Sequence, residues 1–153
     1  MRVVFDTNVV LSGAGWRHEP YACLVLAARR KALPYATVET LNELRRIATQ
    51  MHAEGVFPRD PWPVLNWYFR FARLVDPAPV GRQRSRDAQD DPFLACALGA
   101  RAACIVSRDP DLLVLQKPFG VEIITPRTLL SRSIHLSESG RAPSTADSRG
   151  RLR

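Results

Sequence analysis

Acidic residues next to the predicted strands are the ones in this chain whose type and spacing could do chemistry. Asp6 closes the apolar run that begins the chain, and Asp109 lies shortly after the predicted strand over 102–107. Asp91 opens a predicted helix, and Glu43 lies in another, just after the second predicted strand. In a parallel sheet, functional groups gather beyond the carboxyl ends of the strands. We therefore expect these four acids to converge at one sheet edge.

Such a convergence of carboxylates predicts a metal site. Crowded carboxylates repel one another unless a divalent cation neutralises them, and hard oxygen ligands suit Mg²⁺ or Mn²⁺. One or two such ions can activate a water and stabilise the charge on a phosphodiester. We expect Asp6 to hold the metal. Thr7 and Asn8 would orient Asp6 or the water, and Ser107 would do the same beside Asp109.

Each acid also has a simpler interpretation. Asp91 precedes Pro92 and Asp109 precedes Pro110, which is typical of an N-cap followed by proline in the first helical position. Asp6 has no predicted helix directly after it, so capping explains it less well. Glu43 falls on the flank of the apolar stripe of its helix, and Glu39 falls toward solvent. Of these two glutamates, Glu43 is the candidate for the site, with an ordinary boundary position as the alternative.

The elements that must position these acids alternate between strands and helices. Strands are predicted over 2–6, 32–37, 72–77, 102–107 and 121–125, and helices over 21–32, 38–53, 62–72, 92–100 and 110–115, with one or two further helical turns from Pro126. This alternation predicts the α/β class: a mostly parallel central sheet covered on both faces, which is a three-layer α/β/α sandwich.

Composition limits the class of protein. Within 153 residues we expect one domain over 1–132 and a disordered basic tail over 133–153, where Ser, Gly, Pro and Arg replace the apolar periodicity. No uninterrupted apolar stretch is long enough to span a membrane, and no signal peptide is evident. The three cysteines form no Cys-x-x-Cys pair and lie among apolar residues, which favours buried reduced thiols in a cytoplasmic protein.

Four blocks of sequence resemble the PIN domains. These are VVFDTNVVLSG (3–13), TLNELRRI (40–47), DDPFLACAL (90–98) and CIVSRDPDLL (104–113). Their order and spacing are most similar to the small bacterial PIN proteins of the VapC-like toxin type, and the similarity covers roughly residues 2–130. Ser107 stands where that family usually has threonine, which keeps the hydroxyl.

The resemblance implies a divalent-metal-dependent ribonuclease that is the toxin component of a toxin–antitoxin system. By motif, the acids of the family correspond to Asp6, Glu43, Asp91 and Asp109, of which Asp6, Asp91 and Asp109 would hold Mg²⁺ or Mn²⁺. Asp111 fits a less constant acid near the site. The resemblance also implies a cognate antitoxin protein that blocks the acidic site, and many members of the family form homodimers.

The basic charge of the chain agrees with an RNA substrate. There are 22 Lys and Arg against 15 Asp and Glu, which gives a net charge of +7. A basic protein of this size often binds a polyanion, although arginine enrichment also suits a solvated surface. Arg82, Arg84 and Arg86 precede Asp91, and Arg108 adjoins Asp109, so these four arginines are candidates for gripping RNA phosphates.

Two other readings compete with the nuclease. A phosphoacceptor receiver domain has similar alternation, and Lys117-Pro118-Phe119 resembles its Lys-Pro-Phe sequence, but here this triplet precedes the last predicted strand. A receiver also needs a pair of acids at the end of the first strand, where only Asp6 stands. The stronger rival is a PIN-like domain that binds nucleic acid or a partner without catalysis. A test of metal dependence separates that reading from the nuclease.

Overall fold

The fold is built on a parallel β-sheet. The structure is a computed structural model that describes residues 1–80 and 91–139. Within them the strands are β1 (Arg2–Phe5), β2 (Leu33–Ala36), β3 (Arg73–Leu74), β4 (Cys104–Val106) and β5 (Glu122–Ile124). They form one sheet of order β3-β2-β1-β4-β5, and every neighbouring pair is parallel. β1 therefore lies at the centre of the sheet, beside β4.

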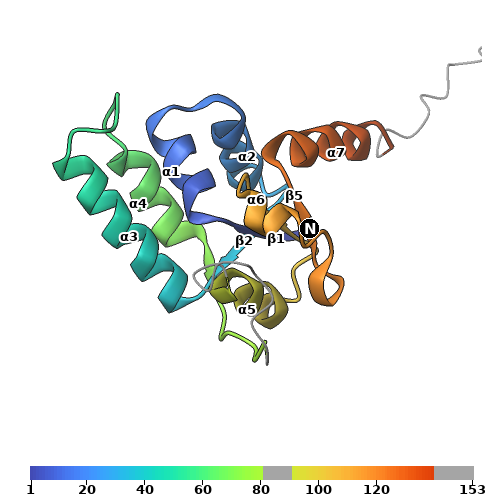
Figure 1. The fold of residues 1–153 in the computed structure, drawn as a ribbon. Helices are drawn as coiled ribbons and strands as arrows, with labels where there is room; N and C mark the ends of the chain where they lie inside the picture. The colour runs from blue at the N-terminus through green and yellow to red at the C-terminus, as the bar shows by residue number, and fades with distance from the viewer. Residues whose placement is uncertain (81–90, 140–153) are drawn as a thin grey trace, which may run out of the picture.

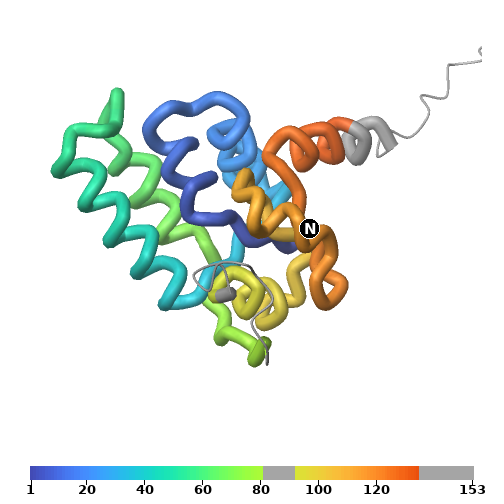
Figure 2. The backbone as a smooth tube through the Cα atoms, viewed as in Figure 1, coloured from blue at the N-terminus to red at the C-terminus, as the bar shows by residue number. Residues whose placement is uncertain are grey.

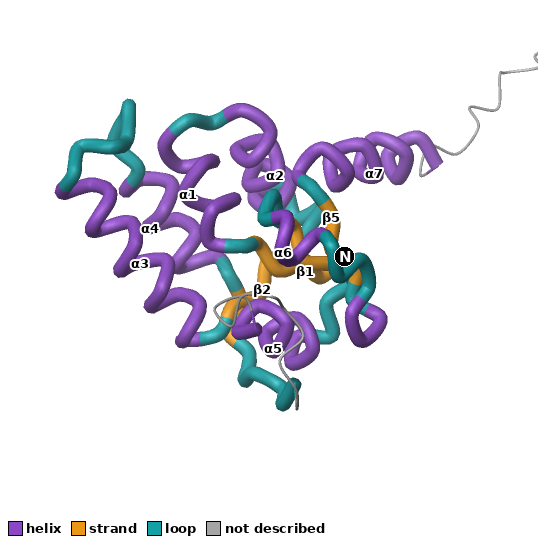
Figure 3. The backbone as a smooth tube through the Cα atoms, in the orientation of Figure 1, coloured by secondary structure: helices purple, strands orange, loops and turns teal. Residues whose placement is uncertain are grey.

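Helices cover both faces of this sheet (Figure 1). They are α1 (Thr7–Gly15), α2 (His18–Ala28), α3 (Val38–Ala53), α4 (Trp62–Phe71), α5 (Asp91–Ala100), α6 (Pro110–Leu113) and α7 (Pro126–Ser139), with a 3₁₀ turn at Pro118–Gly120. Figure 3 shows the strands at the centre and the helices around them. The three-layer α/β/α sandwich predicted from the alternation of strands and helices is confirmed.

Two hydrophobic clusters separate the layers. Val3 and Phe5 of β1 pack in the cluster that includes α1 to α4 and the start of α7. Val4, which points to the opposite face, packs with Phe93 and Leu94 of α5. This alternation follows from the two-residue period of a strand, and burial on both faces explains why Val3–Phe5 is a continuous apolar run.

The element boundaries differ from the prediction mainly next to β1. The helix predicted over 38–53 is confirmed as α3, whereas α1 was not predicted at all, and α2 begins at His18 rather than at residue 21. α7 is longer than the one or two turns expected and passes residue 133, where the basic tail was expected to begin. Residues 140–153 of that tail lie outside the described residues, so the boundary at 132 stays a prediction.

The burial of the cysteines agrees with the expectation of buried reduced thiols. Cys23, Cys96 and Cys104 are buried and free. Among the described residues, none of the helices has the length and apolarity needed to cross a membrane.

Candidate active site

Asp6 and Ser107 occupy equivalent positions at the carboxyl ends of the two central strands. β1 and β4 pair with Phe5 opposite Val106, so Asp6 and Ser107 are the next residues on each strand. The Asp6 amide donates to the Val106 carbonyl at 3.0 Å, which extends the ladder by one bond. Asp6 is 4% exposed and Ser107 is fully buried. Strand pairing therefore places the first predicted acid and the predicted hydroxyl side by side.

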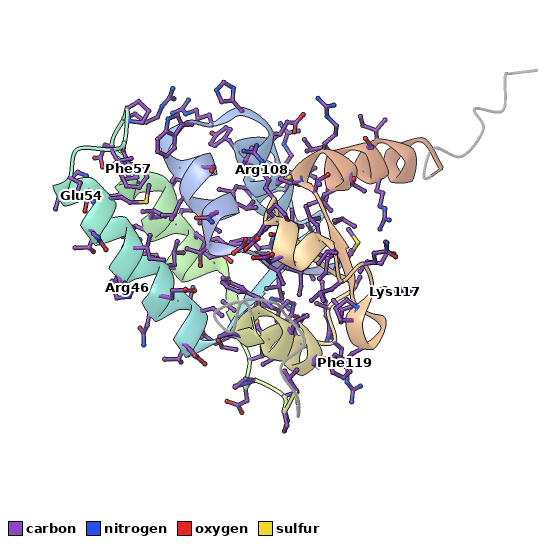
Figure 4. All side chains as sticks on the ribbon, viewed as in Figure 1. Arg46, Glu54, Phe57, Arg108, Lys117 and Phe119 are labelled. Carbon is purple, nitrogen blue, oxygen red and sulfur yellow. The ribbon has the colours of Figure 1, made fainter. Side chains whose placement is uncertain are left out.

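The Ser107 hydroxyl connects two of the predicted acids. Its Oγ donates to Oδ2 of Asp6 at 2.9 Å and accepts the backbone N–H of Asp109 at 2.9 Å. The first bond orients the Asp6 carboxylate, and the second holds the loop that carries Asp109. Figure 4 shows side-chain oxygen atoms gathered between α1 and α6, where these segments meet.

Asp6 precedes a helix, which corrects the expectation that none follows it directly. It is the N-cap residue of α1, with extended backbone angles, yet its side chain makes no capping hydrogen bond within that position. α1 escaped prediction because its apolar residues do not form a single stripe: Val9, Val10 and Leu11 are consecutive, and all three are buried. The carboxylate of Asp6 thus faces Ser107 and the sheet edge instead of closing the helix.

Glu43 approaches the same place from α3. It is half-buried, and its Oε2 accepts a hydrogen bond of 3.2 Å from Oγ1 of Thr7, the neighbour of Asp6. Glu39, one turn earlier, is exposed. The start of α3 is fixed by a reciprocal cap between the buried residues Thr37 and Thr40. This cap sets the position of the helix turn that carries Glu43.

Asp109 is the N-cap that the sequence suggested, and it also lies close to Asp6. As the N-cap of α6, it accepts the N–H of Asp111 through Oδ1 at 2.9 Å. It is also close enough to Asp6 to affect the pKa of that carboxyl. Asp111 lies in the first turn of α6 and is half-buried. Capping therefore positions Asp109 close to Asp6.

The electrostatics of the site disfavour the negative charge on Asp6. Burial raises the pKa of Asp6, and the nearby carboxylates of Asp109 and Glu43 raise this pKa further. The hydrogen bonds from Ser107 and from the Thr7 backbone lower the pKa but do not offset the burial. A buried carboxylate with like-charged neighbours is stabilised by a cation, and oxygen ligands of this type suit a divalent metal. The donor set present at the sheet edge therefore fits the predicted metal.

The remaining predicted site residues are either exposed or have side chains that the structure does not describe. Asn8 is exposed in the first turn of α1, and Arg108 is exposed after β4. Asp91 begins α5, but its side chain lies outside the described residues, as do Arg82, Arg84 and Arg86. Among the side chains that are described, no group of three His, Cys, Asp or Glu is arranged to hold a metal ion.

Sequence reasoning missed a pocket next to these acids. It is lined by Thr7, Thr40 and aliphatic residues of α1 and α3, together with one aromatic residue from each of four further elements: Phe5, Tyr35, Tyr68 and Phe93. Tyr68 lies in α4, and its ring is buried. Aromatic residues on a buried stripe carry no signal that separates a core position from a pocket wall.

Comparisons with known proteins agree with this fold. The sequence profile of the PIN domain matches residues 2–111. The crystal structure of PAE2754 from Pyrobaculum aerophilum superposes with a TM-score of 0.57 over 88% of this chain and 90% of that chain, at 17% sequence identity, which is a likeness of fold. No curated protein matches the chain. Because the family profile covers most of its length, the chain belongs to the PIN domain family.

Proposed function

We propose that this chain is a divalent-metal-dependent endoribonuclease, and that it is the toxin component of a toxin–antitoxin system. The main support for the nuclease assignment is the buried carboxylate of Asp6, which has Asp109 and Glu43 close enough to raise its pKa. A protein keeps mutually repelling carboxylates at a buried strand end at a cost in stability, which binding a cation offsets. PIN domains are generally nucleases and generally use divalent metal ions.

Mg²⁺ or Mn²⁺ would be held by Asp6, Asp109 and Asp91. Asp6 and Asp109 follow neighbouring strands, and Asp91 begins the helix that leads into β4. When bound, the metal supplies charge stabilisation and water activation for hydrolysis of a phosphodiester. Glu43 is the acid left outside this ligand set, and we assign it to positioning water or substrate.

The chain's own hydroxyl groups orient these acids. Ser107 fixes the rotamer of Asp6 through its 2.9 Å hydrogen bond. Thr7 holds Glu43 at 3.2 Å, so that a residue of α3 is tied to the first turn of α1. Supporting hydrogen bonds of this kind keep metal-binding carboxylates in one orientation before the ligand arrives.

RNA as the substrate rests on charge and on the family resemblance. A net charge of +7 favours a polyanionic substrate. The toxin role and the antitoxin partner rest on the similarity of the sequence blocks to VapC-like toxins. The expected phenotype is growth arrest on expression of the wild-type chain, absent on expression of Asp6→Asn and relieved by the product of a neighbouring small gene.

The decisive experiment is cleavage of a labelled single-stranded RNA by purified protein in Mn²⁺, in Mg²⁺ and in EDTA. Asp6→Asn, Asp91→Asn and Asp109→Asn should each abolish a metal-dependent activity. Glu43→Gln should reduce it strongly, and Glu39→Gln, on the exposed side of the same helix, is the matched control and should leave it unchanged.

Two results would count against the proposal. Cleavage that survives EDTA or the acid substitutions would come from a contaminant. Absence of cleavage from folded protein free of any inhibitor would instead support the alternative, a PIN domain that binds nucleic acid or a partner without cutting it.

A further inference from the structure

Charge is unevenly distributed along the sheet edge that carries the candidate site. The strands β1, β4 and β5 are neighbours and parallel, so the residues that follow them lie in the same order along one edge. Asp6 follows β1, Arg108 follows β4 by two residues, and Arg127 follows β5 by three. The acids Asp6 and Asp109 therefore follow β1 and β4, and the exposed arginines Arg108 and Arg127 follow β4 and β5.

Arg127 lies where α2 and α7 come together. Its Nε donates to Oε1 of Glu19 at 3.1 Å, with 81% of the arginine side chain exposed and 39% of the glutamate side chain exposed. The thiol of Cys23 donates to the Pro126 carbonyl at 3.5 Å, which joins the two helices beneath this pair. Figures 1 and 2 show the start of α7 beside α2. The Arg127 guanidinium is thus displayed to solvent from a well-packed base.

Arg108 and Arg17 both lie near α2, the helix that carries Glu19. Arg108 lowers the pKa of the buried Cys23 thiol, which places its charge near α2. Figure 4 shows Arg108 where α2, α6 and α7 meet. Arg17, just before α2, lies over the ring of Tyr21 at 5.1 Å. Among the described residues, neither Arg17 nor Arg108 forms a salt bridge.

We infer that Arg17, Arg108 and Arg127, here named the basic rim, bind the backbone phosphates of single-stranded RNA on one side of the cleavage site. This inference rests on the proposed ribonuclease function and adds a direction to it. The bound strand passes from Asp6 and Asp109, at the ends of β1 and β4, past the end of β5 toward the junction of α2 and α7. Exposed guanidinium groups are well suited to phosphate contacts, and of these three only Arg127 is paired with a carboxylate among the described residues.

Glu19 partly neutralises the charge of Arg127 in the basic rim, so substitutions at Glu19 and Arg127 test the inference. The Glu19 carboxylate competes with phosphate for Arg127 through the 3.1 Å pair. If Arg127 binds RNA, neutralising Glu19 should strengthen binding and neutralising Arg127 should weaken it. If the pair serves only to hold α2 against α7, both substitutions should act in the same direction.

The experiment measures fluorescence anisotropy of a labelled single-stranded RNA with the full-length chain carrying Asp6→Asn, so that the RNA is not cut. In this background, Arg108→Gln and Arg127→Gln should each weaken binding by about three- to tenfold and lower the salt dependence by about 0.7 per lost phosphate contact. Glu19→Gln should tighten binding by about twofold or more, as expected when a competing charge is removed. Arg29→Gln is the matched control, because Arg29 is an exposed arginine at the opposite end of α2.

The inference is overturned if the rim variants bind RNA as the Arg29→Gln control does, if Glu19→Gln weakens binding, or if no RNA is bound. Its failure can be told apart from that of the proposed function. If the rim variants change RNA binding but the wild-type protein never cuts RNA, the nuclease proposal is rejected and the basic rim is retained as an RNA-binding surface. If metal-dependent cleavage occurs and the rim substitutions do not affect it, the nuclease proposal is retained and the basic-rim inference is rejected.

Discussion

The Ser107 hydroxyl donates a hydrogen bond of 2.9 Å to Asp6, although the two residues are 101 positions apart in the sequence. The same oxygen accepts the amide of Asp109 at 2.9 Å, so one hydroxyl connects the carboxyl ends of β1 and β4. Ser107 is fully buried. A buried hydroxyl that both donates and accepts a hydrogen bond fixes the positions of its two partners.

Removing the Ser107 hydroxyl should weaken both the site and the fold. Ser107→Thr and Ser107→Val add similar bulk, so the difference between them reports the hydroxyl alone. We expect the valine variant to be less stable than the threonine variant by about 1–3 kcal/mol, since it leaves the Asp109 amide without an acceptor. We also expect it to need about 10–100-fold more metal for cleavage. Urea unfolding and metal titration of the cleavage rate measure the two effects.

Equal stability and equal metal dependence of these two variants would show that the hydroxyl has no part in orienting Asp6. The Thr variant also serves as a packing control, because loss of stability in both variants relative to wild type reports the added methyl group.

Asp6→Asn should stabilise the metal-free protein at neutral pH. The pKa of Asp6 is higher in the folded chain than its ordinary value, mainly through burial. Between the ordinary and the raised pKa the folded state therefore binds more protons than the unfolded state, and the free energy of unfolding falls as pH rises. The asparagine variant lacks this loss, and we expect a gain of roughly 0.5–2 kcal/mol at neutral pH.

The measurement is the unfolding free energy of both proteins in EDTA as a function of pH. The advantage of Asp6→Asn should be complete above the raised pKa and should disappear below the ordinary pKa of an aspartic acid. If the variant is less stable than wild type at neutral pH, the charged Asp6 carboxylate does not destabilise the fold, and the metal proposal loses its main support.

The three cysteines should be unreactive in the folded protein. Burial raises the pKa of Cys23 and of Cys96 to about 12, and that of Cys104 to about 11. The thiolate is the reactive form, so at mildly alkaline pH these thiols are both protonated and inaccessible. We expect no rapid reaction with a chromogenic disulfide reagent in native buffer and full reaction of all three thiols in denaturant. Fast native labelling of one cysteine would show that its surroundings open.

Much of this fold could be predicted from sequence periodicity. α3 was predicted with its observed bounds because its apolar residues recur at helical spacing, and the strands were predicted because they are short apolar runs between turn signals. α1 was not, since seven of its nine residues are buried and a helix surrounded by core has no polar face to give it a period. The helix that escaped prediction is the one that begins the site.

The site could be predicted as a set of residues more readily than as a geometry. The first strand's end identified Asp6, and the helical wheel favoured Glu43 over Glu39. The 3.2 Å contact between Thr7 and Glu43 depends on how α3 crosses the sheet, which sequence spacing does not determine. The Arg127–Glu19 pair joins residues 108 positions apart, so no local pattern could reveal it.

Gly99 tests the packing of α5, the helix that begins with Asp91. Gly99 lies inside this helix, where alanine is ordinarily favoured over glycine by about 1 kcal/mol. A Cβ at Gly99 would collide with the backbone carbonyl of Asp76, in a segment that is also held by the bond from the Ala78 amide to the Ala95 carbonyl at 3.0 Å. Because backbone cannot move aside as a side chain can, we expect the collision to outweigh helix propensity.

Gly99→Ala should therefore lower the free energy of unfolding by about 1–3 kcal/mol, the usual cost of overpacking. Gly120→Asn is the control, because Gly120 has open space around it and asparagine tolerates its positive φ of 81°. We expect that variant to stay within about 0.5 kcal/mol of wild type in urea unfolding. If Gly99→Ala is instead more stable than wild type, the 76–78 segment does not pack against α5 in solution. The position of Asp91 relative to β4 would then not be fixed by this contact.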